Sequence, residues 1–104
     1  MDEAIQEFSA ALRIVPDFAE AHANLGSALV AKGRNKEALD QFQEAVREAP
    51  QRPDFHYGAG VVLESLGQSA EAAEQFKAAL ELNSGMEQAK RALENLSRRS
   101  AGTP

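Results

Sequence analysis

Residues 19–52 read AEAHANLGSALVAKGRNKEALDQFQEAVREAPQR, and residues 53–86 read PDFHYGAGVVLESLGQSAEAAEQFKAALELNSGM. A shift of 34 residues places the second stretch on the first, and the identities combine aromatic, charged and small residues. They include His22 with His56, Gly26 with Gly60, Gly33 with Gly67, Phe42 with Phe76 and Ala45 with Ala79. Chance rarely aligns such different residues at one offset, so the chain is a repeat protein.

The apolar residues inside each unit recur at the three- and four-residue steps of a helix. Ala21, Leu25, Ala28 and Leu29 show this spacing. The pattern predicts an all-α fold without strands and about six helices. We expect the helices at residues 2–14, 19–32, 36–48, 53–66, 70–82 and 87–98.

Helix ends carry their own signals in this sequence. Gly33 and Gly67 follow the first helix of each unit, where glycine suits a left-handed C-terminal cap. Pro16 and Pro50 follow the second helix, which proline cannot continue. Ser69 is the predicted N-cap of the helix that starts at residue 70.

Two glycines, Gly26 and Gly60, fall in the middle of predicted helices. Each lowers helix stability by about 1 kcal/mol relative to alanine. This cost is understandable if the backbone of another helix approaches closely at both positions. Phe42 and Phe76 are expected to fill the space between the helices.

Composition restricts the classes of function. Of the 104 residues, 43% are hydrophobic and 26% are charged, as in ordinary globular domains. No run approaches the roughly 20 apolar residues of a membrane span, and the acidic start MDEAIQEF is unlike a secretory signal. The chain has no cysteine and a net charge of −5, which disfavours binding to nucleic acid or anionic membranes. We therefore predict a cytoplasmic protein without membrane insertion or nucleic-acid binding.

The repeat resembles the tetratricopeptide repeat. The resemblance rests on the period of 34 residues and on Leu25, Gly26, Leu29, Gly33, Ala38, Phe42, Ala45 and Pro50. The next unit repeats most of these residues but has Ser84 where proline is usual. The resemblance implies a superhelix of antiparallel helix pairs over residues 1–99. Residues 100–104 are predicted from their sequence to form a disordered tail. It divides this domain into the second half of a repeat (2–18), two full repeats (19–52 and 53–86) and a capping helix (87–99).

The stretch around Asn24 is similar to repeats of the O-GlcNAc transferase type and their bacterial relatives. In those repeats an asparagine at this position recurs and lines the inner groove, whereas here Gly58 and Ala92 follow at the equivalent positions. A continuous asparagine ladder is therefore absent. The family's carboxylate clamp, which needs basic residues on the first helices, is not expected either. Those surfaces carry Glu20, Ala23, Ser27, Asp54, Tyr57 and Gly58.

Candidate catalytic and metal-binding residues are few. His22 and His56 occupy the same position one repeat apart, about one helix-packing distance, so a single ion cannot reach both. We interpret both as packing residues and Glu44 with Glu48 as solvated charges. The sequence therefore predicts no enzyme activity, no cofactor and no metal site.

The resemblance implies a concave groove that is lined by the first helix of each repeat and binds a peptide or protein partner. By position its lining residues are Glu20, Asn24, Ser27, Asp54, Tyr57, Val61, Glu64, Arg91 and Asn95. Tyr57 is the preferred anchor, because aromatic residues dominate binding hot spots, although it could equally pack against the next helix. An acidic groove favours a basic or polar peptide.

The opening half-repeat lacks a partner helix over Ala4, Phe8 and Ala11. Either further repeats precede this segment, or a second copy covers the face and forms a homodimer. The basic residues near the end of the last helix, Arg98 and Arg99, suit a helix C-terminus, with an acidic partner as the alternative. We predict a protein-interaction scaffold. The alternative is the non-catalytic targeting portion of a larger enzyme, such as a glycosyltransferase.

Overall fold

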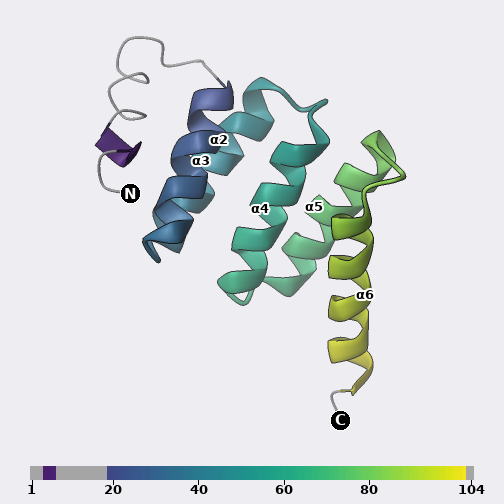
Figure 1. Ribbon diagram of the computed structural model, residues 1–104. Helices are drawn as coiled ribbons and strands as arrows, with labels where there is room; N and C mark the ends of the chain where they lie inside the picture. Colours follow the sequence, from purple (N-terminus) through teal and green to yellow (C-terminus); the bar gives the residue numbers. More distant parts are fainter. Residues whose placement is uncertain (1–3, 7–18, 103–104) are drawn as a thin grey trace.

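The computed structural model describes residues 4–6 and 19–102, and these residues are helical apart from short connections (Figure 1). The helices are α2 (Ala19–Ala31), α3 (Asn35–Glu48), α4 (Pro53–Ser65), α5 (Ser69–Leu82) and α6 (Glu87–Gly102). Residues 4–6 are helical as well, and the described part of the chain holds no strand. The all-α prediction is confirmed, and the bounds of α2 to α5 agree with the predicted ones to within one residue. Most of the predicted helix at 2–14 lies outside the described residues.

The helices pair in chain order to form a short superhelix. Helix α2 packs against α3, α4 packs against α5, and α3 with α4 and α5 with α6 join the pairs. Short turns make successive helices run in opposite directions (Figure 1). The resulting molecule is elongated, with extents of 48 × 27 × 18 Å. Helices α2 and α4, the first helices of the two full repeats, lie beside one another, and α6 follows α4 (Figure 1). The candidate site lies along these three helices.

Glycine ends the first helix of both full repeats, as predicted. Gly33 has a φ of 77° and Gly67 a φ of 81°, in the left-handed region. The Arg34 amide donates to the Leu29 carbonyl at 2.9 Å, and the Gly33 amide donates to the Val30 carbonyl at 2.9 Å. These two bonds form a Schellman cap, which satisfies carbonyls that the helix end leaves without an intrahelical partner. The tight reversal sends the chain back along its own helix.

The N-cap prediction at Ser69 is wrong. Helix α5 begins at Ser69 itself, and Gln68 takes the N-cap position without a side-chain hydrogen bond. The Schellman turn at Gly67 leads directly into the helix, so the chain enters α5 one residue earlier than expected. The Ala72 amide finds its acceptor in the Gln68 carbonyl at 3.0 Å.

Phenylalanine rings occupy the space that the helical glycines leave. A Cβ atom at Gly26 would lie 2.9 Å from the Phe42 ring, and one at Gly58 would lie 2.5 Å from the same ring. At Gly60 the added Cβ would lie 2.6 Å from Cε1 of Phe76. The predicted close approach is therefore real, but a phenyl ring approaches rather than the backbone of another helix.

Helix α6 extends past its predicted end at residue 98 and reaches Gly102. The backbone at residues 100–102 thus continues the helix where a tail was expected. Residues 87–101 contain neither proline nor glycine, so no helix-breaking residue stops α6 before Gly102.

Candidate partner-binding groove

A hollow of about 380 Å³ lies between α2 and α4. Helix α2 turns every third side chain toward it, namely Asn24, Ser27 and Val30, and all three are exposed. Gly58 on α4 contributes no side chain, so the Phe42 ring lines the hollow beside it. Six of the nine residues predicted for the groove meet here. They are Glu20, Asn24, Ser27, Asp54, Tyr57 and Val61.

A second hollow of about 410 Å³ adjoins the first, between α4 and α6. It holds the other three predicted residues, Glu64, Arg91 and Asn95, together with Gln88 and Ala92. Tyr57 and Val61 line both hollows. The structure therefore brings all nine predicted residues to one continuous face, and their role in binding a partner stays a prediction.

Tyr57 combines the two roles that the sequence left open. Its ring packs on Phe76 with 5.7 Å between the ring centroids and a tilt of 46°. The same residue is only half-buried and lines the junction of both hollows. Packing on Phe76 thus holds the tyrosine in place at the centre of the groove.

The side chain of Arg52 compensates the charge of Asp54. Its Nε and Nη2 atoms donate to the two carboxylate oxygens of Asp54 at 3.0 and 2.8 Å. These bonds lower the pKa of Asp54, and they raise the pKa of Arg52, to which the charge of Glu20 adds. The guanidinium carbon also lies 4.3 Å from the centroid of the Phe55 ring, a cation–π geometry. Arg52 therefore lines the groove with its head group already oriented, a role that sequence reasoning missed.

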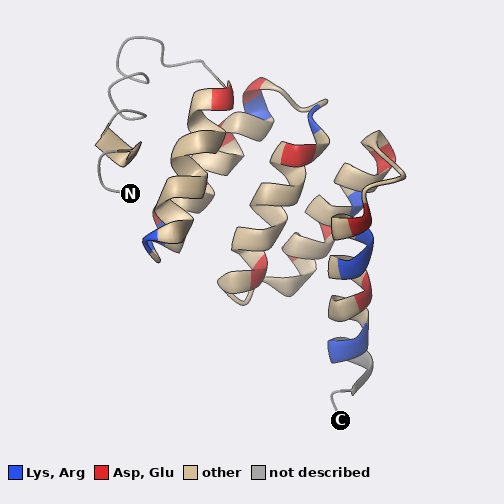
Figure 2. Ribbon diagram, in the orientation of Figure 1, with Lys and Arg blue, Asp and Glu red and all other residues tan. Residues whose placement is uncertain are grey.

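A second arginine compensates Glu64. The Arg99 side chain on α6 donates to the Glu64 carboxylate on α4, which joins the two helices at one end of the second hollow. Figure 2 shows the basic residues of α6 alternating with acidic ones along this helix. The sequence predicted an acidic groove with Asp54 and Glu64 among its charges. In the structure both of these carboxylates have arginine partners, which reduces the acidic charge of this surface.

The tetratricopeptide repeat pattern matches residues 1–53 and again residues 24–87. The chain belongs to the tetratricopeptide repeat family. No curated protein matches its sequence. None of the described helices combines the length and apolar character that crossing a bilayer requires.

Solved tetratricopeptide structures share the fold at low sequence identity. MamA superposes with a TM-score of 0.93 at 23% identity, over 96% of this chain and 58% of the MamA chain. The first tetratricopeptide domain of Spaghetti (RPAP3), bound to an HSP90 peptide, gives a TM-score of 0.94 at 22% identity over 97% and 80%. The translocator chaperone SycD of Yersinia enterocolitica gives 0.89 at 21% over 95% and 80%. This chain thus spans little more than half of MamA.

The two histidines hold equivalent places in the two tetratricopeptide repeats. Nδ1 of His56 lies 2.8 Å from Oε1 of Gln75, and its Nε2 donates to the Pro50 carbonyl at 2.7 Å. His22 repeats the first contact, with Nδ1 at 2.8 Å from Oε1 of Gln41. Each histidine is buried and connects the two helices of its repeat, as expected for a packing residue.

The glutamates of α3 do not both behave as predicted. Glu44 is exposed to water over 44% of its side chain and accepts two hydrogen bonds from Arg47. Glu48, in contrast, exposes only 8% of its side chain and faces His22. The interpretation of Glu48 as a solvated charge is therefore wrong. Sequence comparison of the repeats gave no signal for this burial, because the equivalent residue of the second repeat, Leu82, is itself 46% exposed.

Of the three residues predicted to form the self-association edge, the structure describes only Ala4, which is half-buried. The neighbouring Ile5 packs against the apolar cluster of the first repeat. Phe8 and Ala11 lie outside the described residues, so the edge stays a prediction.

Proposed function

We propose that this chain is a protein-interaction module that binds an extended segment of a partner along the two adjoining hollows. The observation that carries the proposal is their continuity, since Tyr57 and Val61 line both of them. Grooves with an apolar centre and a few oriented polar groups are typical of ligand sites. In this family member the module itself would contribute recognition rather than catalysis.

The chemistry of the lining favours a peptide with an apolar side chain at its centre. Val30 is an exposed large hydrophobic residue, and Tyr57 and Val61 add partly exposed apolar surface next to it. Asn24 and Ser27 carry an amide and a hydroxyl beside this surface, which suits hydrogen bonding to a peptide backbone. Such a site selects an aliphatic or aromatic anchor residue in an extended ligand.

The charges of the first hollow favour a basic residue at one end of the ligand. Glu20 and Asp54 are acidic, and Arg52 pairs with Asp54, which leaves one net negative charge among the three side chains. The Spaghetti (RPAP3) domain holds the HSP90 peptide SRMEEVD, which supports peptide binding by this shape of fold. The first helices carry the acidic Glu20 and Asp54 where a basic clamp for such acidic peptides would be expected, so we propose a ligand of opposite charge.

The proposal can be tested by panning a random peptide library against the whole chain. Fluorescence anisotropy then measures the affinity of the selected peptides. Tyr57→Ala and Asn24→Ala are expected to weaken binding, the first by at least tenfold because central aromatic residues carry most of an interface's energy. Gln43→Ala is the matched control, since Gln43 is exposed on α3 and lines neither hollow. Equal affinities in all three variants would refute binding in the groove.

Charge reversal at Glu20 tests whether the charge of the groove, and not only its shape, selects the ligand. Glu20→Lys is expected to shift the selected peptides from basic to acidic flanking residues while circular dichroism shows an unchanged fold. Reversal at Asp54 is less direct, because it would also release Arg52 from its ion pair. Unchanged peptide selection by Glu20→Lys would contradict the proposed ligand charge.

Self-association through Ala4, Phe8 and Ala11 is the second candidate function. Ile5 packs on the first repeat, so the start of the chain lies at the edge where another helix would stack. The SycD structure is described as an alternative dimer, which shows self-association for that protein. Light scattering during size-exclusion chromatography, over a wide dilution range, tests it here: a dimer that Phe8→Glu dissociates supports the edge, and a monomer contradicts it.

The chain could also be the targeting part of a larger enzyme, with the same groove recruiting substrates. Its coverage of only 58% of MamA is compatible with a segment of a longer protein. A catalytic domain in the same natural polypeptide would favour this alternative over an independent scaffold.

A further inference from the structure

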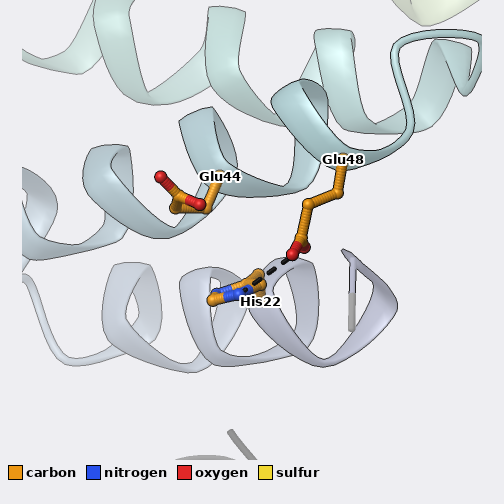
Figure 3. A group of neighbouring side chains, drawn as sticks. All are labelled: His22, Glu44 and Glu48. Atoms are coloured by element: carbon orange, nitrogen blue, oxygen red, sulfur yellow. Dashed lines mark ion pairs between the residues drawn. The ribbon is translucent and has the colours of Figure 1, made fainter. Parts of the chain in front are cut away.

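A histidine and two glutamates form a cluster on the first full repeat, apart from the proposed peptide groove. His22 comes from α2, and Glu44 and Glu48 lie one turn apart on α3 (Figure 3). One potential ligand atom from each residue lies within 4.8 Å of the others. Nε2 of His22 is 3.5 Å from Oε1 of Glu48. Imidazole nitrogen and carboxylate oxygen are the donors that zinc accepts in proteins.

The carboxylate of Glu48 is the second, independent indication. The side chain is more than nine-tenths buried, and neither of its oxygens has a hydrogen-bond partner among the described residues. The ion-pair distances to His22 and Arg47 are 3.5 and 3.9 Å, longer than a hydrogen bond. Burial of a carboxylate without hydrogen bonds is expensive, so a cation closer than the described side chains would stabilise this anion.

The second repeat shows that packing alone does not require the carboxylates. The histidine and its glutamine partner are present in both repeats, as His22 with Gln41 and His56 with Gln75. At the positions equivalent to Glu44 and Glu48, however, the second repeat has Ala78 and Leu82. The acidic pair is therefore an addition to the shared framework rather than a part of it.

Gln41 orients the imidazole for such a site. Its Oε1 lies 2.8 Å from Nδ1 of His22, and the other ring nitrogen, Nε2, faces Glu48 (Figure 3). A hydrogen bond to the second nitrogen commonly fixes the ring of a metal-ligating histidine. The framework glutamine would thus serve as the outer partner of a ligand in the first repeat.

We propose that His22, Glu44 and Glu48 bind one divalent zinc-type ion between α2 and α3, through Nε2 and one oxygen of each carboxylate. Ligand bonds of about 2.1 Å place neighbouring ligand atoms of a tetrahedral ion about 3.4 Å apart. His22 and Glu48 already have this spacing. Both bonds from Arg47 to Glu44 are to Oε2, so Oε1 is the oxygen that Glu44 offers to the ion. A change of rotamer brings this oxygen into place. Magnesium and calcium fit less well, since they prefer six or more oxygen ligands.

The site can be tested by calorimetric titration of the whole chain with zinc chloride. Thermal unfolding is then compared between protein in zinc and protein in chelator. The wild type is expected to bind one ion per chain and to unfold at a higher temperature with zinc than with chelator, because a ligand of the folded state stabilises it. Glu48→Leu and Glu44→Ala copy the second repeat, so each has a precedent in this chain. Each is expected to weaken binding at least tenfold.

His56→Gln and Glu74→Gln are the matched controls. They remove the equivalent histidine and an exposed glutamate of α5, and both are expected to retain the affinity of the wild type. Failure of the wild type to bind zinc stoichiometrically would overturn the proposal, as would unchanged affinity in both Glu48→Leu and Glu44→Ala. Two separate substitutions keep the test informative if one of them fails to fold.

Discussion

Replacement of Gly60 by alanine is expected to destabilise the protein, although alanine is the better helix former. Helix propensity alone predicts a gain of about 1 kcal/mol. The new Cβ atom, however, would lie 2.6 Å from Cε1 and 2.8 Å from Cδ1 of Phe76. This ring is fully buried and packs against Tyr57, so it cannot move aside into solvent. The close contact therefore predicts a loss of stability, whereas helix propensity predicts a gain.

Overpacking of a close-packed core reduces stability by about 1–3 kcal/mol, and the enclosed Phe76 ring places Gly60→Ala at the upper end. Subtraction of the propensity gain leaves a net loss of about 1–2 kcal/mol, which for a domain of this size lowers Tm by about 4–16 °C. Thermal and urea unfolding followed by circular dichroism measure both quantities. Gly26→Ala should cost less, because its Cβ would lie 2.9 Å from the less enclosed Phe42 ring.

A double-mutant cycle identifies the cause of the loss. In a Phe76→Leu background the smaller side chain leaves space for a methyl group at Gly60, so Gly60→Ala should lose its penalty there. The coupling between the two sites is then measured directly. An increase in the stability of the wild type on Gly60→Ala would refute the reasoning, since it would mean that the phenyl ring yields without cost.

Three further substitutions follow from the described contacts. Gly33→Ala should lower the unfolding free energy by about 1–2 kcal/mol because a φ of 77° disfavours any side chain, even though no atom lies within 4 Å of the new Cβ; equal stability in urea unfolding would contradict this. Arg52→Ala should raise the pKa of Asp54 in an NMR titration, because Arg52 hydrogen bonds lower it. Since that pKa is depressed in the folded state, the pair stabilises the protein above the usual range of an aspartate, and its contribution disappears as the pH falls through the folded pKa; an unchanged titration would refute the assignment. Without metal, Glu48→Leu should raise the unfolding free energy by about 1–3 kcal/mol, because it removes a buried carboxylate without hydrogen bonds; a decrease in chelator-treated protein would show that the His22 pair already satisfies it.

Features that repeat along the chain were predictable from the sequence. The period of 34 residues located helices α2 to α5 to within one residue, and Gly33 and Gly67 identified two helix ends correctly. The nine groove residues were carried over by position from the resemblance to the tetratricopeptide repeat; the structure brings them to one face, and their role in binding stays a prediction. Periodic features depend on local spacing, which a single sequence contains in full.

Features that depend on side-chain conformation across helices were missed. Arg52 pairs with Asp54 across Pro53, where the chain enters α4. Residue spacing alone does not determine the side-chain rotamers that this pairing needs. The ion pair of Glu64 with Arg99 joins residues of α4 and α6, and α6 continues past the predicted helix end at residue 98. Burial of Glu48 was also missed, since charge suggests solvent exposure unless the opposite helix is placed.

The position of the Phe42 ring has a consequence for how the molecule opens. The ring belongs to the first full repeat, yet it lies against Gly26 of that repeat and Gly58 of the next. Neither repeat can detach without leaving one side of this phenyl group in water. The stability of a repeat array is the sum of the stabilities of single repeats and of the interfaces between neighbouring repeats. A residue that packs in both repeats contributes to the interface term. Amide hydrogens of α3 and α4 should therefore exchange together, as one cooperative unit, while the outer end of α6 exchanges earlier.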